Sequence, residues 1–298
     1  AERRVLGGAL VLAAAVVAGF GLGAAISPSG LTTSLAVPAL GVQTLMTVGA
    51  LPRRDPASAL RPGLVLLALH LLIASVPMLA LGIIIGLDDP IGLGIFLIGA
   101  APPAALIPAY ADVAEVPGGE LLAFVLIAYG LALGLTPLLV LLAAGEVAGL
   151  GTIALTLAAG LIVPSILARI LHPQIAAIPQ RVRRGVVNVA VFAICFGLGE
   201  GLSEIDAAAG TLALVLLALA VRSMGGAALA ERIAPPALRT EAPFAIAFKN
   251  IALAAAVGGS VSGTAAALPA LLGFPVELLC FLWLAHRTAR RQTSPSPR

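Results

Sequence analysis

Three prolines interrupt an apolar run at residues 99–108, which reads Gly-Ala-Ala-Pro-Pro-Ala-Ala-Leu-Ile-Pro. An interior proline removes a backbone donor and clashes with the preceding turn, so we expect a helix to break at Pro102, Pro103 and Pro108. The surrounding apolar run, 90–112, is long enough to cross a membrane. Because lipid cannot pair the freed carbonyls, the broken backbone must face protein or a water-filled cavity.

The whole chain has the composition of a membrane protein. Of its 298 residues, 60% are hydrophobic and only 10% are charged, and the mean hydropathy is +1.10. A soluble domain carries roughly 25% charged residues, so a soluble enzyme and a nucleic-acid-binding protein are both excluded. The sequence has no CxxC, GxSxG, HExxH or Walker motif, and we expect no metal, no cofactor and no enzymatic activity.

Ten apolar runs are expected to be transmembrane helices of an all-α protein. Five of them precede Gly145 and five follow it, so the second half is expected to be inserted upside down, as in the inverted repeats of secondary transporters. The halves are residues 1–145 and 146–291, and 292–298 are expected to be a disordered cytoplasmic tail. The runs lie at about 5–25, 31–51, 62–86, 90–112, 119–143, 149–171, 185–203, 208–228, 241–260 and 265–286.

The basic residues predict the orientation of these helices. With the N-terminus inside, sixteen of the 17 basic residues, Arg222 among them, fall on the cytoplasmic side. By the positive-inside rule this predicts a multi-pass protein of a bacterial-type inner membrane, with both termini in the cytoplasm. The opposite loops carry acids instead: Asp88, Asp89, Glu146, Glu200, Glu204 and Asp206.

The seventeenth basic residue, Lys249, lies inside the ninth run. A lysine at mid-membrane costs ~2.5–3.5 kcal/mol on insertion scales, and Lys249 lies about 15 Å along a helix from Arg239, too deep for easy snorkelling. Asn250 follows it, so the ninth run is expected to break opposite the fourth. His70 and Glu277 are the other polar residues singled out at membrane depth, and Glu277 is a candidate counter-charge for Lys249.

These features resemble the bile acid:sodium symporter family along most of the chain. That family reads Cys-Cys-Pro-Gly-Gly-x-x-Ser-Asn in its fourth helix, where this chain has Ala100 to Pro108, and Thr-Pro in the fifth, where it has Thr136-Pro137. The family's ninth helix reads Glu-x-x-x-Gln-Asn-x-x-Leu-Ala, and its counterpart here runs from Ala245 through Lys249-Asn250 to Leu253-Ala254. The order and spacing of the motifs carry the resemblance more than any one of them.

The departures from the family pattern fall on its sodium ligands. The resemblance places those ligand positions on Ile107, Pro108, Leu121, Val125 and Ala245, and it places two glutamines on His70 and Lys249. Apolar side chains and proline offer a sodium ion no hard oxygen ligand. The resemblance therefore implies degenerate sodium sites in which the Lys249 ammonium replaces an ion.

We expect a sodium-independent secondary transporter of a small organic anion, carboxylate-like or bile-acid-like, with the lipid bilayer as its other partner. The candidate substrate and coupling site comprises His70, Pro102, Pro103, Pro108, Lys249, Asn250 and Glu277. Because histidine titrates near neutral pH, a proton is a possible coupling species. A non-transporting membrane sensor and a sodium symporter with unusual ligands remain alternatives, whereas Ala100, Ala101 and Ala245 argue against an arsenite carrier.

Overall fold

The structure, a computed structural model, describes residues 2–26, 31–50, 56–145, 154, 158–199 and 209–293. These residues form helices, and no β-strand occurs among them. Helix covers most of the described part of each of the ten expected apolar runs. The fourth run is divided into two helices, and so is the ninth.

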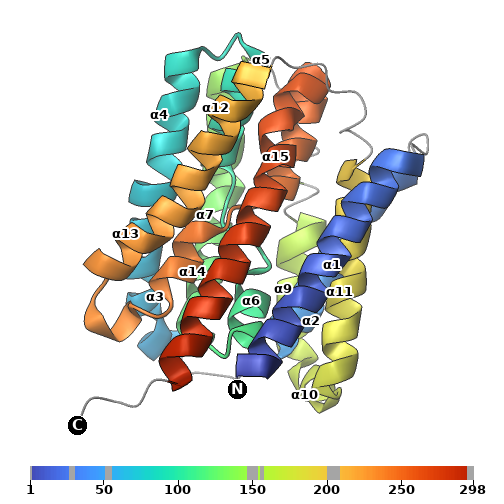
Figure 1. The fold of residues 1–298 in the computed structure, drawn as a ribbon, viewed down its shortest axis with the longest axis vertical. Coiled ribbons are helices and arrows are strands. Elements are labelled where there is room, and N and C mark those ends of the chain that lie inside the picture. Colours follow the sequence, from blue (N-terminus) through green and yellow to red (C-terminus); the bar gives the residue numbers. More distant parts are fainter. Residues whose placement is uncertain are drawn as a thin grey trace.

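The helices pack as two groups that stand side by side (Figure 1). In the first group α1 packs against α11, which packs against α2, and α2 packs against α9. The first group comprises α1 (Glu2–Ile26), α2 (Leu31–Ala50), η2 (Ala158–Ile162), α9 (Val163–Ile170), α10 (His172–Ala177) and α11 (Gln180–Gly199).

The second group holds both of the broken runs. Its central pair is α5 and α15, and α3 packs on α7 beside them. The second group comprises α3 (Pro56–His70), η1 (Leu71–Ser75), α4 (Val76–Ile85), α5 (Pro90–Ala100), α6 (Ile107–Val113), α7 (Gly119–Ala144), α12 (Ala209–Ala220), η4 (Val221–Gly225), α13 (Gly226–Ile233), η5 (Pro236–Leu238), α14 (Ala242–Ala247) and α15 (Ile251–Thr293).

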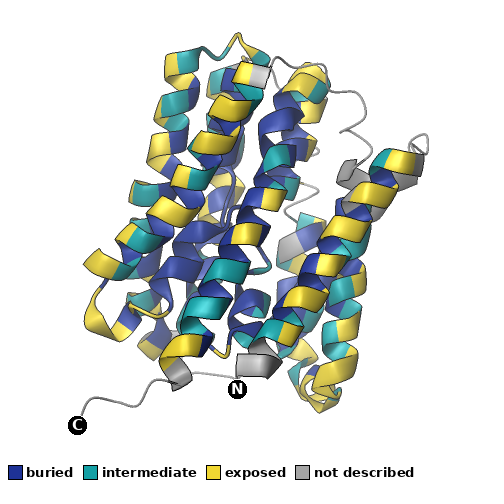
Figure 2. Cartoon of the chain, in the orientation of Figure 1, coloured by how far each residue is buried: buried dark blue, intermediate teal, exposed yellow. Residues whose placement is uncertain are grey.

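Five helical stretches in the described residues are long and apolar enough to cross a membrane. The outer faces of these stretches carry exposed large apolar side chains, among them Leu72, Ile84 and Leu142 (Figure 2). Such faces suit lipid rather than water. The five stretches are Leu6–Ala25, Ser58–Ile85, Gly119–Ala143, Gly210–Ile233 and Val261–Arg291.

Two long helical stretches contain a π-helical turn near their middle. In the first, η1 joins α3 to α4, and Pro77 follows it in the first turn of α4. A π-turn shifts the backbone hydrogen bonds from the i→i+4 to the i→i+5 pattern, so a proline, which has no N–H to donate, is tolerated beside it. In the second, η4 joins α12 to α13 and is followed by Gly226. Both of these π-turns precede a broken run in the chain, and a third π-turn, η2, precedes α9 in the sixth run.

The element α15 consists of two helices, one in each of the last two apolar runs. They join at Ser262 and Gly263, whose backbone angles are not helical; Gly263 has φ +74°, a value that favours glycine. The second helix ends at Thr293, so residues 292 and 293 are helical rather than part of a disordered tail. The rest of that tail, the start of the second half at 146, and the acids Glu146, Glu200, Glu204 and Asp206 lie outside the described residues.

Candidate functional site

The two broken runs cross through short extended segments deep in the second group. Between α5 and α6 the chain is non-helical around Pro102 and Pro103, and between α14 and α15 it is non-helical around Lys249. Pro103 and Lys249 form an isolated antiparallel bridge. The break predicted in both runs is confirmed. Pro108, however, lies in the first turn of α6 and does not interrupt a helix there.

The backbone bonds of this crossing are reciprocal. Asn250 N donates to Pro102 O at 2.8 Å, and Ala104 N donates to Phe248 O at 3.3 Å. The two bonds flank the Pro103–Lys249 bridge: one joins Pro102 to Asn250, and the other joins Ala104 to Phe248. They satisfy polar backbone groups that neither lipid nor a continuous helix would satisfy.

The ammonium of Lys249 is held by four acceptors at the crossing. The side chain is 1% exposed. Its Nζ lies 3.0 Å from Gly99 O and 2.8 Å from Ser75 Oγ, and it also donates to Ala101 O. The fourth contact is His70 Nε2, at 3.3 Å. Since an ammonium has three N–H donors, this arrangement leaves none for a ligand.

The tautomer of His70 follows from its contacts. Its Nδ1 lies 2.7 Å from Ala245 O, a carbonyl that only accepts, so Nδ1 must carry the proton. With Nδ1 protonated, Nε2 of a neutral ring accepts from Lys249. A protonated Lys249 therefore has the imidazole as one of its acceptors.

The carbonyls at the end of α5 are paired by side chains from other elements. Pro102 and Pro103 offer no N–H to the preceding turn. Gly99 O and Ala101 O accept from Lys249, and Thr136 Oγ1 donates to Ala100 O at 2.8 Å. A cation is also favoured here because a helix C-terminus carries partial negative charge.

Glu277 is paired with Arg222, which corrects two sequence-based expectations. Arg222 was expected at a solvated cytoplasmic helix end, but it is 4% exposed, and its Nη2 lies 2.5 Å from Glu277 Oε1. The same carboxylate oxygen accepts from the backbone N–H of Lys249 at 2.9 Å. Glu277 therefore balances the arginine and caps the extended segment, while the Lys249 ammonium contacts other acceptors.

Asn250 begins the helix α15. Its Oδ1 accepts from Leu253 N, three residues on, at 3.0 Å, the bond of a helix N-cap. Its Nδ2 is buried without a partner, and so are both amide atoms of Gln43 on α2. Both side chains line a cavity of about 40 Å³ beside the crossing. The two helix groups thus present unpaired amides to one small space.

The five positions that align with family sodium ligands are apolar and buried. Ile107, Leu121, Val125 and Ala245 belong to the hydrophobic core, and Pro108 is buried beside them. Among the described residues, no group of three or more His, Cys, Asp or Glu side chains is placed to hold a metal ion.

Sequence reasoning missed Ser75, Thr136 as a hydrogen-bond donor, Arg222 and Gln43. Arg222 carried a usable signal, because it lies well inside an apolar run. Ser75 and Thr136 are short hydroxyl residues that are common in membrane helices, so their types alone gave no signal.

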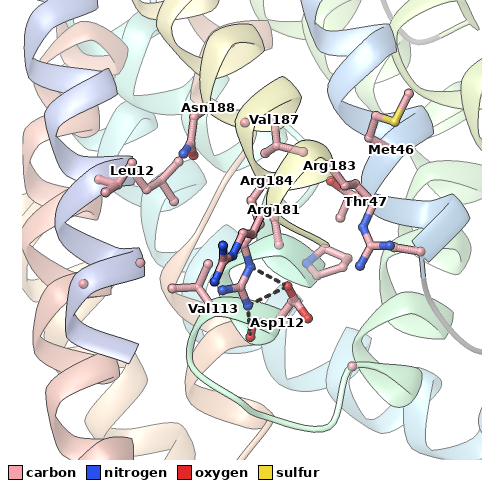
Figure 3. A pocket seen from close by; sticks show the side chains of 18 of the residues that line it. Leu12, Met46, Thr47, Asp112, Val113, Arg181, Arg183, Arg184, Val187 and Asn188 are labelled. Atoms are coloured by element: carbon pink, nitrogen blue, oxygen red, sulfur yellow. Dashed lines mark hydrogen bonds and ion pairs between the residues drawn. The ribbon is translucent and has the colours of Figure 1, made fainter. Parts of the chain in front are cut away.

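A larger cavity of about 680 Å³ lies between the two groups of helices. Figure 3 shows Arg181, Arg183 and Arg184 of α11 around it, with Asp112 of α6. Arg184 Nη2 lies 3.0 Å from Asp112 Oδ2, so this ion pair joins the first group to the second.

Neither a scan against protein-family models nor a search of curated proteins found a match to the chain.

Proposed function

We propose that the chain is a sodium-independent secondary transporter of an organic anion, built on the plan of the bile acid:sodium symporter family. In this proposal ten membrane spans form two inverted halves, residues 1–145 and 146–291. The observation that carries the proposal is the position of Lys249. A fixed ammonium lies where two broken helices cross, bonded to backbone carbonyls as a metal cation would be.

The inverted repeat is supported by the order of the elements in the two halves. In the first half the π-helical turn η1 is followed by the broken fourth run, and in the second half η4 is followed by the broken ninth run. The two broken runs meet at the Pro103–Lys249 bridge, whose two hydrogen bonds are those of any antiparallel bridge. The π-helical turn η2, in the sixth run, has no counterpart in α1.

Orientation is supported by charges at the two ends of the molecule. The turn between α4 and α5, at the upper end in Figure 1, carries Asp88 and Asp89. The lower end holds α10, the first residues of α11 with their arginines, the start of α1 and the end of α15. The positive-inside rule places this lower end in the cytoplasm, so the 680 Å³ cavity would open inward.

We propose the loss of sodium coupling for two reasons: the ligand positions of the family offer the ion no oxygen, and a positive charge is already present at the crossing. The core fills the ligand positions with apolar side chains. Lys249 already supplies the positive charge that the carbonyls at the end of α5 attract. A proton remains the candidate coupling species, since His70 and Lys249 are in contact and one accepts where the other donates.

The test is ligand binding followed by uptake. Full-length protein in detergent is screened for thermal stabilisation by small organic anions in choline buffer, because a ligand that binds the folded state must raise its melting temperature. Ligands that stabilise it are then offered, radiolabelled, to proteoliposomes. We expect at least one anion to be taken up above protein-free vesicles. Binding without uptake would contradict the transporter and favour a membrane sensor.

A further inference from the structure

The cavity of about 680 Å³ has one cationic wall and several apolar ones. Its cationic wall is the start of α11, and the facing wall is α6. The remaining lining comes mainly from α1 and α2, with apolar side chains such as Val11 and Leu12. Such a cavity suits a ligand with a charged head and a short apolar body.

Charge balance indicates how many negative charges that head carries. The described lining has three arginines, Arg181, Arg183 and Arg184, and one acid, Asp112. Its formal charge is therefore two positive. A dianion would match this net charge, whereas a monoanion would leave the cavity with a net positive charge.

Asp112 acts as a built-in competitor for the ligand. Arg184 reaches its carboxylate through Nε at 3.2 Å and Nη2 at 3.0 Å, and its backbone carbonyl through Nη2 at 3.2 Å. The two side chains are 28% and 41% exposed, so the pair is screened by water and weak. An incoming anion would release Arg184 at small cost.

A second polar group in the cavity lacks a partner. Thr47 on α2 is buried, and its hydroxyl has no hydrogen bond. An unpaired buried hydroxyl lowers the stability of the folded protein. A polar ligand atom that bonds to Thr47 would remove that cost. It lies on a different helix from the arginines, so a ligand head between them would contact both α2 and α11.

We propose that this cavity binds an organic dianion, either a dicarboxylate or a phosphate monoester, which displaces Asp112 from Arg184 and is held by Arg181 and Arg184. The inference deepens the proposed function by naming the charge of the ligand, and it rests on that function only in treating the ligand as a transported one. Equilibrium binding needs no part of the Lys249 site, so the two proposals fail separately.

Isothermal titration of the full-length detergent-purified chain tests the charge selectivity. The probes are adipate and hexyl phosphate as dianions, and hexanoate as a monoanion of equal carbon count. We expect at least one dianion to bind at least tenfold more tightly than hexanoate, and its affinity to fall as salt rises. Equal affinity for hexanoate, or binding of no dianion together with no copurified phospholipid, would overturn the proposal.

Variants distinguish arginines that bind a ligand from arginines that only set the orientation of the chain in the membrane. Arg184→Gln and Arg181→Gln should each weaken dianion binding, by about tenfold for Arg184, since it makes charged hydrogen bonds. Asp112→Asn should tighten it by about two- to fivefold, because the competitor is removed. Arg232→Gln, an exposed arginine outside the cavity, should bind as the unmodified chain does.

The source of the dianion is separated by phosphorus analysis. If a lipid phosphate monoester occupies the cavity, phosphatidate should copurify with the unmodified chain and be lost from Arg184→Gln, which assigns the dianion to a lipid. A copurified phosphodiester lipid, whose phosphate carries one negative charge, would overturn the proposal. Unchanged dianion binding in Asp112→Asn and Arg184→Gln alike would overturn the proposal. Arg181→Gln, whose side chain is exposed, keeps the test valid if Arg184→Gln does not fold.

Discussion

Two buried cations in the second helix group are stabilised in different ways. Lys249 gives its donors to carbonyls, a hydroxyl and an imidazole, with no carboxylate on its ammonium. Arg222 is neutralised by Glu277, and its Nε and Nη1 have no hydrogen-bond partner. A buried charge without compensation is costly, so both arrangements are expected to be essential to folding.

The Arg222–Glu277 pair predicts a strongly non-additive mutant cycle. Glu277→Gln keeps an acceptor for Lys249 N but leaves the arginine charge unpaired, which should cost about 3–5 kcal/mol. Arg222→Met with Glu277→Gln removes both charges and should be clearly more stable than Glu277→Gln alone. Melting temperatures in detergent provide the measurement. A double variant as unstable as the sum of the singles would show that the charges are not coupled.

At the scale of the elements, the crossing depends on two short breaks, one between α5 and α6 and one between α14 and α15. The chain ends α5 with prolines and ends α14 at Ala247, after which Phe248 is extended (φ −119°, ψ 126°). It begins α15 with the Asn250 cap, so each extended segment stays short. A cap that fails would let the start of α15 unwind into the neighbouring cavity.

The cap predicts different outcomes for two substitutions at Asn250. Asn250→Ala removes the acceptor of Leu253 N and should destabilise the protein by about 0.5–2 kcal/mol. Asn250→Ser keeps an N-cap oxygen and should lose much less, because the Nδ2 that it discards has no partner. Melting temperatures of the two variants decide the point, and equal losses would mean that the side chain acts through something other than the cap.

The positions of the helices could be predicted from sequence because apolar runs and prolines act locally. The break at 102–103 needed only the rule that proline cannot donate. The partners of Lys249 could not be predicted, because Gly99, Ser75 and Ala101 reach it through tertiary packing. Arg222 was misplaced although its position inside an apolar run is a signal of burial; only the structure shows that its partner is Glu277.

At the scale of the whole molecule, the crossing with its fixed charge lies within the second group, whereas the two groups meet beside it and at a cavity with a weak ion pair. The core of the second group is mostly apolar, and buried polar side chains such as His70, Ser75 and Thr136 are hydrogen-bonded there. The boundary between the groups holds the unpaired amides of Gln43 and Asn250 and the arginines of α11. Relative movement of the groups would change that boundary and leave the Lys249 site intact, so the Lys249 side chain would stay in place where a bound sodium ion would enter and leave.

The central claim, that Lys249 replaces a sodium ion, is tested most directly by uptake of an identified anion into proteoliposomes in sodium chloride and in choline chloride. The unmodified chain should transport equally well in both. Lys249→Met should lose transport in both salts, and Lys249→Gln should not gain sodium dependence, because Ala245 still offers no carboxylate. Uptake by the unmodified chain that requires sodium, or a fully active Lys249→Met protein, would contradict the account.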